Sequence, residues 1–174
     1  MNENKNIILV GLMGSGKTTI GKQLSKSLER KFLDTDHAIE EKTGVDVSTI
    51  FELEGEEGFR SREHNFLKDL KGSQKLVIAT GGGIVISIKN RDLLKKLGCV
   101  VYLRSNIKDL VSRLKNDKTR PLIQSVNLSQ KISDLFNERD PLYLAVADYI
   151  IDTKNKKVSD IKNEILELLN KCKQ

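Results

Sequence analysis

The sequence predicts an α/β protein, a three-layer sandwich in which a five-stranded parallel sheet is flanked by helices. Two observations predict this fold class. Short apolar runs rich in β-branched residues alternate with segments of helical periodicity along the 174 residues. No repeat, low-complexity tract or proline-rich linker divides the chain. Strands that alternate with helices form a parallel sheet covered on both faces, so we expect a single domain over residues 1–174.

Each expected strand is a short apolar run, and a helical pattern follows it. The strand candidates are Ile7–Val10, Lys31–Leu33, Leu76–Ala79, Cys99–Leu103 and Tyr149–Ile151. The first helix carries Ile20, Leu24 and Leu28 at helical spacing, and further patterns lie near 37–43, 47–70, 87–97, 106–116, 129–147 and 157–171. Ligands of such sheets bind beyond the carboxyl ends of the strands. The residues that directly follow each strand are therefore the candidates for a functional site.

A glycine-rich turn joins the first strand to the first helix. Residues Gly11–Thr18 fit the pattern G-x-x-x-x-G-K-[ST] of a phosphate-binding loop. Glycines let successive backbone N–H groups converge on an anion, and the helix N-terminus adds a partial positive charge. Lys17 can reach the outer phosphates of a nucleotide, and the Thr18 hydroxyl can hold Mg²⁺. The sequence therefore predicts that the chain binds a nucleoside triphosphate, rather than that the turn only caps a helix.

Two carboxylates, Asp34 and Asp36, follow the second strand. They point the same way if the chain is extended there, but Asp36 could instead be the N-cap of a helix beginning at His37. Many phosphate-loop proteins hold their metal with an acid at the end of another strand, yet the third strand runs into Thr80 and three glycines. Asp34 is thus the nearest candidate to support Mg²⁺, which leaves Asp36 to receive a proton from an attacking hydroxyl.

Other candidates are ambiguous when each is taken alone. Gly81–Gly83 could form a plain turn, or could let backbone N–H groups approach a compact ligand. Arg60 could simply form a surface ion pair with Glu63, three residues along a helix. The same simple explanation applies to other arginines, namely Arg113, Arg120 and Arg139.

Three segments look like insertions over the functional edge of the sheet. They are the helical stretch Thr35–Phe59, the basic stretch Lys115–Ser129 and the polar loop Asp152–Lys157. The second has few apolar anchors and is typical of a mobile lid. We therefore place a substrate-binding region at about 34–62 and a lid at about 113–128.

Composition narrows the classes of partner and of site. A net charge of +6 suits either a nucleic-acid partner or a small anionic substrate with ATP. Lys and Arg are scattered among acids, and aromatic residues make up only 5% of the chain with none interleaved in a basic run, which favours the second. Cys99 and Cys172 form no C-x-x-C, and His37 and His64 are isolated, which argues against a disulfide or zinc framework. No apolar run approaches the roughly 18 residues of a membrane span. We expect a cytoplasmic monomer without nucleic-acid or membrane partners.

Six motifs together resemble the shikimate kinase family in their order and spacing. The first, Gly-Leu-Met-Gly-Ser-Gly-Lys-Thr-Thr-Ile-Gly, is shared by many nucleotide-binding families, but the set is specific. The others are Asp34-Thr35-Asp36, Gly55-Glu56-x-x-Phe59-Arg60-x-x-Glu63, Thr80-Gly81-Gly82-Gly83, Thr119-Arg120-Pro121-Leu122 and Arg139-x-Pro141-Leu142-Tyr143. The resemblance extends from Asn6 to about Leu169.

The resemblance implies transfer of the γ-phosphoryl group of ATP to the 3-hydroxyl of shikimate, a step of aromatic amino-acid biosynthesis. It implies one Mg²⁺ per subunit, with Thr18 as a ligand and Asp34 supporting the metal. The nucleotide would be bound by Gly14, Ser15, Gly16, Lys17, Thr18, Thr19, Arg113, Arg120 and Lys156, of which Arg113 and Lys156 lie at the adenine. Shikimate would be bound by Asp36, Arg60, Gly81, Gly82, Gly83 and Arg139. The catalytic residues would be Asp36, Lys17 and the lid arginine Arg120.

The sequence departs from the family pattern in two places, the lysine-rich loop around Lys156 and the segment between Leu122 and Ser129. Two alternatives also stay open. One is another small phosphate-loop kinase that acts on a nucleoside monophosphate or a sugar acid. The acidic pair disfavours an acceptor that carries phosphate, because like charges repel, but does not disfavour gluconate. The other is a nucleotide-switched binding protein, for example one that binds nucleic acid.

Overall fold

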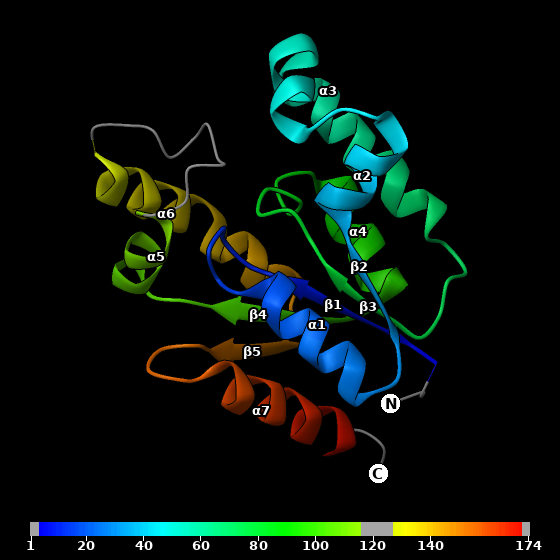
Figure 1. The fold of residues 1–174 in the computed structure, drawn as a ribbon, viewed down its shortest axis with the longest axis vertical. Helices are drawn as coiled ribbons and strands as arrows, with labels where there is room; N and C mark the ends of the chain where they lie inside the picture. Colours follow the sequence, from blue (N-terminus) through cyan, green and yellow to red (C-terminus); the bar gives the residue numbers. More distant parts are fainter. Residues whose placement is uncertain (1–3, 116–126, 172–174) are drawn as a thin grey trace.

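The computed structural model describes residues 4–115 and 127–171, and its centre is a five-stranded sheet with helices on both faces (Figure 1). The spatial order of the strands is β2-β3-β1-β4-β5, and every neighbouring pair is parallel. The strands are β1 (Asn6–Val10), β2 (Lys31–Asp34), β3 (Leu76–Ala79), β4 (Gly98–Arg104) and β5 (Tyr149–Asp152). The predicted fold class and the five predicted strands are confirmed.

Seven helices lie in the described ranges, and the central strand β1 separates them into two layers. They are α1 (Lys17–Ser27), α2 (Thr35–Thr43), α3 (Val47–Asp69), α4 (Ile88–Leu97), α5 (Ile107–Leu114), α6 (Leu128–Val146) and α7 (Val158–Lys171). Ile8 and Val10 pack with residues of α3 to α6, whereas Ile7 and Leu9 pack with α1 and α7. Successive strand residues point to opposite faces, so an apolar run without alternation is what a strand buried on both faces requires.

The register of the sheet brings the ends of three strands to one edge. In β3, Ala79 is aligned with Asp34 of β2 on one side and with Leu9 of β1 on the other. Thr80 then bonds back to β1, because its Oγ1 donates to the Leu9 carbonyl at 3.0 Å. The phosphate-binding loop, the acidic pair and the glycine triplet therefore all begin at the same edge.

Helices α2 and α3 form a separate projection beyond this edge (Figure 1). They have a small core of their own, made of Ile39, Ile50 and Phe59. The sequence predicts a helical pattern near 47–70, and the structure interrupts that pattern at one residue. Gly55 has φ 70° and ψ −175°, so α3 is two helical segments joined at a kink. A left-handed φ suits glycine, which has no Cβ to clash with the backbone.

Residues 116–126 of the predicted lid lie outside the described ranges, and Arg120 is among them. In the ranges that are described, no helix is both long and apolar enough to cross a lipid bilayer.

Candidate active site

The loop between β1 and α1 depends on glycine at three positions. Gly11, Gly14 and Gly16 have φ values of 146°, 78° and 92°, which side chains rarely tolerate. A Cβ on Gly11 would also lie 2.7 Å from the Leu103 carbonyl oxygen of β4. These glycines fold the loop tightly over the sheet edge, and α1 begins directly behind Gly16. Backbone N–H groups and the positive end of α1 thus face one place, as anion binding requires.

Two side chains at the start of α1 are held by their surroundings. Lys17 is buried, and its Nζ donates to the carbonyls of Gly11 and Leu12 at 2.7 and 2.9 Å. Thr18 Oγ1 donates to Asp34 Oδ2 at 2.8 Å. The ammonium group is thus fixed at the loop, and the Thr18 hydroxyl and the Asp34 carboxylate form a pair of adjacent oxygen donors.

The cap of α2 differs from one sequence interpretation. The N-cap is Asp34, whose Oδ1 accepts from the Asp36 N–H at 3.2 Å, and the helix begins at Thr35 rather than at His37. Asp36 is therefore in the first helical turn, and the two acids are not an extended pair. The reason is that β2 passes into α2 without a connecting loop, so the last strand residue is also the cap. Capping does not explain Asp36.

A cavity of about 570 Å³ lies in front of the loop. Several predicted site residues line it, namely Gly14, Ser15, Gly16, Lys17, Thr18, Thr19, Asp34, Asp36, Gly82, Arg113 and Lys156. Arg60 and Arg139 are not among its lining residues, and they approach it from the side of Gly82 and Gly83.

The glycine triplet after β3 is a contact point for three separate groups. A Cβ on Gly81 would lie 2.5 Å from Asp36 Oδ1, and one on Gly82 would lie 3.2 Å from the Met13 N–H nitrogen of the phosphate loop. A Cβ on Gly83 would overlap the Arg60 guanidinium. Each glycine thus permits one close approach, which a plain turn would not need.

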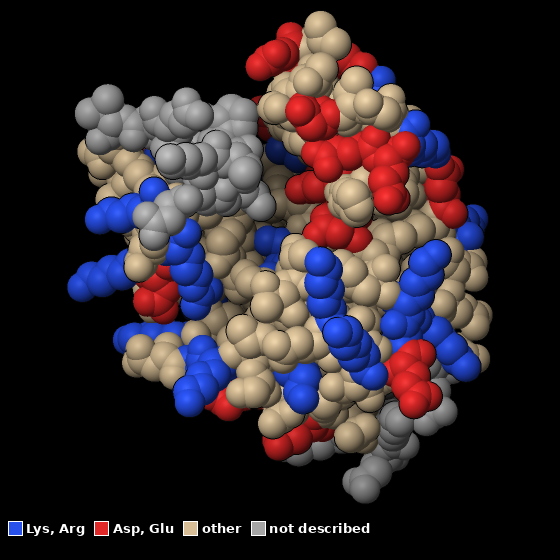
Figure 2. Space-filling view, in the orientation of Figure 1, with Lys and Arg blue, Asp and Glu red and all other residues tan. Residues whose placement is uncertain are grey.

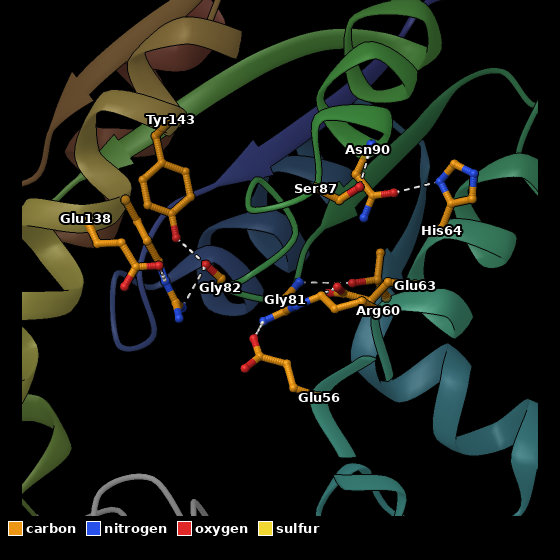
Figure 3. A network of polar contacts seen from close by, with 12 residues as sticks. Glu56, Arg60, Glu63, His64, Gly81, Gly82, Ser87, Asn90, Glu138 and Tyr143 are labelled. Atoms are coloured by element: carbon orange, nitrogen blue, oxygen red, sulfur yellow. Dashed lines mark hydrogen bonds and ion pairs between the residues drawn. The ribbon is translucent and has the colours of Figure 1, made fainter. Parts of the chain in front are cut away.

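Two arginines flank the triplet, of which Arg139 is buried and Arg60 is partly buried. Arg60 Nη1 donates to Glu63 Oε2 at 2.7 Å, and Nη2 donates to Glu56 at 2.9 Å (Figure 3). Arg139 Nη1 donates to the Gly82 carbonyl at 3.4 Å. Among the described residues, neither Nε atom has a hydrogen-bond acceptor, although both are buried. A buried N–H without an acceptor is costly, so these two donors indicate a place for an anionic ligand.

Glu63 was treated by the sequence analysis only as a surface partner of Arg60, and its burial was missed. Its side chain is fully buried, whereas the Arg60 side chain is 18% exposed. Burial raises the pKa of Glu63 to about 7, an effect that Arg60 opposes and the nearby Asp36 reinforces. The helical spacing from Arg60 is equally typical of an exposed pair, and the motif that contains Glu63 does not indicate whether the side chain is buried.

Charges are segregated on the face that contains the site. Figure 2 shows acidic side chains gathered over α2 and α3, and Lys and Arg mainly over the rest of this face. The exposed acids of these two helices include Glu41, Asp46, Glu52, Glu54, Glu56 and Glu57. We call this group of acids over α2 and α3 the negative rim.

The nucleotide side of the cavity has two cations that are already bonded. Arg113 Nη1 donates to the Gly14 carbonyl at 3.0 Å, and Lys156 Nζ forms an ion pair with Glu164 of α7 at 2.6 Å. In the described part of the chain, no group of three or more His, Cys, Asp or Glu could hold a metal ion by itself. A metal here would need oxygens from a ligand as well, which is the usual arrangement for Mg²⁺ with phosphates.

Comparison with known proteins agrees with this geometry. The family model described as shikimate kinase matches residues 13–170. Shikimate kinase of Vibrio parahaemolyticus is 47% identical over 169 residues, which are 97% of this chain and 98% of the relative. Shikimate kinase of Burkholderia lata is 47% identical over 92% of this chain and 88% of the relative.

Solved structures give the same result. Shikimate kinase from Acinetobacter baumannii, in complex with shikimate, is 48% identical with a TM-score of 0.93, and the match covers 98% of this chain and 95% of that one. Shikimate kinase from Bacteroides thetaiotaomicron is 32% identical with a TM-score of 0.89, covering 95% and 98%.

Proposed function

This chain belongs to the shikimate kinase family, and from that premise we propose that it transfers the γ-phosphoryl group of ATP to the 3-hydroxyl of shikimate. One observation carries the proposal beyond the family match. Arg60 and Arg139 have buried Nε donors without hydrogen-bond acceptors among the described residues, and both arginines lie beside a cavity that is lined by the phosphate loop. A guanidinium pair of this kind binds a carboxylate by charge-assisted hydrogen bonds. Shikimate is a small carboxylate with three ring hydroxyls.

Asp36 orients the hydroxyl that reacts. Its carboxylate lies next to Gly81 and lines the cavity between the phosphate loop and the arginines. With the acceptor carboxylate held at one end, one hydroxyl is directed to Asp36, and the reacting atoms are brought close together. Asp36 accepts the proton of that hydroxyl as the new P–O bond forms.

Cations neutralise the charge that develops on the transferring phosphoryl group. Lys17 serves this role from the loop, and Arg120, which lies outside the described residues, serves it from the lid. Thr18 and Asp34 would hold Mg²⁺, consistent with their paired oxygens 2.8 Å apart. Bound Mg²⁺ supplies charge neutralisation on the phosphate oxygens. Arg113 and Lys156 contact the adenine end, and residues 1–174 act as one kinase domain.

The negative rim over α2 and α3 supports this acceptor over a nucleoside monophosphate. A phosphate-bearing acceptor carries more negative charge than a carboxylate, and Asp34, Asp36 and the rim repel it. Gluconate has a single carboxylate and is not disfavoured by charge. A coupled ADP-release assay over shikimate, quinate, gluconate and nucleoside monophosphates tests the proposal. Turnover of shikimate well above the others is expected, and turnover of a nucleotide without shikimate would exclude it.

Arg139→Ala is expected to raise the KM for shikimate by roughly 10- to 10²-fold, because the carboxylate loses charge-assisted hydrogen bonds worth about 1.5–3 kcal/mol. The KM for ATP should stay within about twofold. Steady-state kinetics with each substrate varied in turn measures both. Arg62→Ala is the matched control, since the Arg62 side chain on α3 is 40% exposed and bonds to Glu54, away from the glycine triplet. A change confined to ATP would contradict the carboxylate clamp.

Shikimate binding is expected to weaken as pH rises through about 7 and to take up protons near that pH. The pKa of Glu63 is already raised to about 7 by burial, and a bound carboxylate beside Arg60 raises it further. Neutral Glu63 therefore favours binding. Because this folded-state pKa lies above that of an unfolded glutamate, the same group stabilises the folded chain below about pH 4.5 and loses that contribution as pH rises to about 7.

Calorimetry in buffers of different ionisation enthalpy counts the protons taken up. The charged groups facing Glu63 are Arg60, Asp36 and Arg139. Glu63→Gln should therefore flatten the pH dependence while binding persists. Equal affinity of the wild type at pH 6 and pH 8, without proton uptake, would show that Glu63 does not titrate with binding.

A further inference from the structure

Asp140 directly follows Arg139 in α6 but is bonded on the other side of the helix. Its Oδ1 accepts from the Tyr102 hydroxyl at 2.7 Å and from Arg104 Nε at 2.9 Å, and its Oδ2 accepts from Arg104 Nη2 at 2.7 Å. Both partners belong to the end of β4. Consecutive helical residues point about 100° apart, so α6 presents Arg139 to the acceptor side and Asp140 to the sheet.

A second contact connects the same strand to the acceptor side. The Tyr102 ring stacks on the Tyr143 ring, with centroids 4.8 Å apart and planes at 26°. The Tyr143 hydroxyl donates to the Gly82 carbonyl (Figure 3), which also accepts from Arg139 at 3.4 Å. Asp140 is therefore linked to Gly82 through its chain neighbour Arg139, which bonds to the Gly82 carbonyl. Tyr102 is linked to Gly82 through Tyr143, on which its ring stacks.

The helix needs such an anchor at this point. Pro141 lies inside α6 and has no N–H, so it cannot donate the usual bond to the carbonyl four residues earlier. The turn that carries Arg139 thus has one backbone hydrogen bond fewer to fix its rotation. Asp140 is 8% exposed, and it supplies three side-chain hydrogen bonds at that turn.

We propose that Asp140, held by Tyr102 and Arg104, is a positioning residue that sets Arg139 against Gly82 for recognition of the acceptor carboxylate. Neither Asp140 nor its two partners lines the 570 Å³ cavity, so they act on the acceptor through Arg139 and Tyr143. The inference rests on the proposed function, because it assumes that Arg139 binds the carboxylate of shikimate.

Asp140→Asn is expected to raise the KM for shikimate by about 5- to 20-fold, since a small displacement of a positioning group weakens recognition strongly. kcat and the KM for ATP should change less than about twofold. Tyr102→Phe keeps the ring stack on Tyr143 and removes only the hydrogen bond to Asp140, so a smaller rise in the KM for shikimate is expected. Asp134→Asn is the control, because Asp134 is exposed on the same helix and contacts Gln130.

A double-mutant cycle separates positioning from a general structural role. In an Arg139→Ala background, Asp140→Asn should cause almost no further rise in the KM for shikimate, because the residue through which it acts is gone. The same full rise in both backgrounds would overturn the inference. If Asp140→Asn does not fold, Tyr102→Phe and Arg104→Gln carry the same cycle, and the Arg104 side chain is 44% exposed.

A neutral acceptor separates this inference from the proposed function. The analogue has the carboxylate of shikimate reduced to a hydroxymethyl group and keeps the 3-hydroxyl. Wild-type enzyme should prefer shikimate strongly, and Asp140→Asn should reduce that preference by the same 5- to 20-fold. A wild type that turns over both compounds equally would contradict carboxylate recognition itself. If the wild type prefers shikimate over the neutral analogue and Asp140→Asn retains that preference in full, only the role of Asp140 is contradicted.

Discussion

Lys17→Ala is expected to lower shikimate turnover by roughly 10³-fold or more without unfolding the domain. Phosphoryl transfer depends on cations placed where charge develops, and loss of one such cation has effects of this order. The Lys17 ammonium is held at the loop by two carbonyls at 2.7 and 2.9 Å. Alanine removes the charge together with both bonds. Turnover is measured by coupled ADP release, and folding by thermal denaturation and circular dichroism.

Lys17→Met is the companion variant, because it keeps most of the side-chain volume at a buried position. Lys26→Ala is the control, since Lys26 is exposed in the last turn of the same helix. Methionine should reproduce the loss seen with alanine, and the control should retain full activity. A methionine variant with near-normal turnover would mean that this position needs side-chain volume and that the ammonium group is not required for phosphoryl transfer.

Asp36→Asn is expected to reduce kcat by roughly 10²- to 10⁴-fold while ATP still binds, if Asp36 accepts the proton of the reacting hydroxyl. The substitution keeps the shape and removes the basic oxygen. Because Asp34 is the N-cap of α2, the change should not remove the cap of that helix. The measurements are kcat under saturating substrates and nucleotide affinity by calorimetry.

Asp92→Asn is the matched control, because Asp92 is exposed on α4 and does not line the cavity. A kcat near that of the wild type for Asp36→Asn would show that the carboxylate only orients the hydroxyl. That outcome is chemically reasonable for a loose transition state, which needs little proton removal. A loss of ATP binding instead would show that Asp36 acts on the nucleotide and not on the acceptor hydroxyl, which would contradict its proposed role.

The strands and the phosphate loop were predictable because their signals are local. β1 is apolar without alternation because both faces of the central strand are buried. The loop needs glycine at positions with a left-handed φ, and a lysine and a threonine must follow. The residues that bind phosphate are therefore adjacent in the sequence and can be recognised there. The edge that holds the site followed from the rule that parallel strands carry ligands beyond their carboxyl ends.

Other features depend on contacts between distant residues, and no local pattern contains them. Burial of Glu63 depends on how α3 packs over β3 and α4, so its spacing from Arg60 does not predict that its side chain is buried. Asp140 and Arg104 are 36 residues apart and meet only because α6 crosses the end of β4. The kink at Gly55 and the cap at Asp34 depend on nearby residues, but the pattern alone does not fix either, since glycine is tolerated in helices and two acids compete for one cap.

A crystal structure of the chain with shikimate and ADP would test the acceptor pocket most directly. The result we expect has the shikimate carboxylate within hydrogen-bond distance of both Arg60 and Arg139, and its 3-hydroxyl on Asp36 facing the phosphate loop. Shikimate bound elsewhere, or bound with its carboxylate turned toward Asp36, would contradict the account.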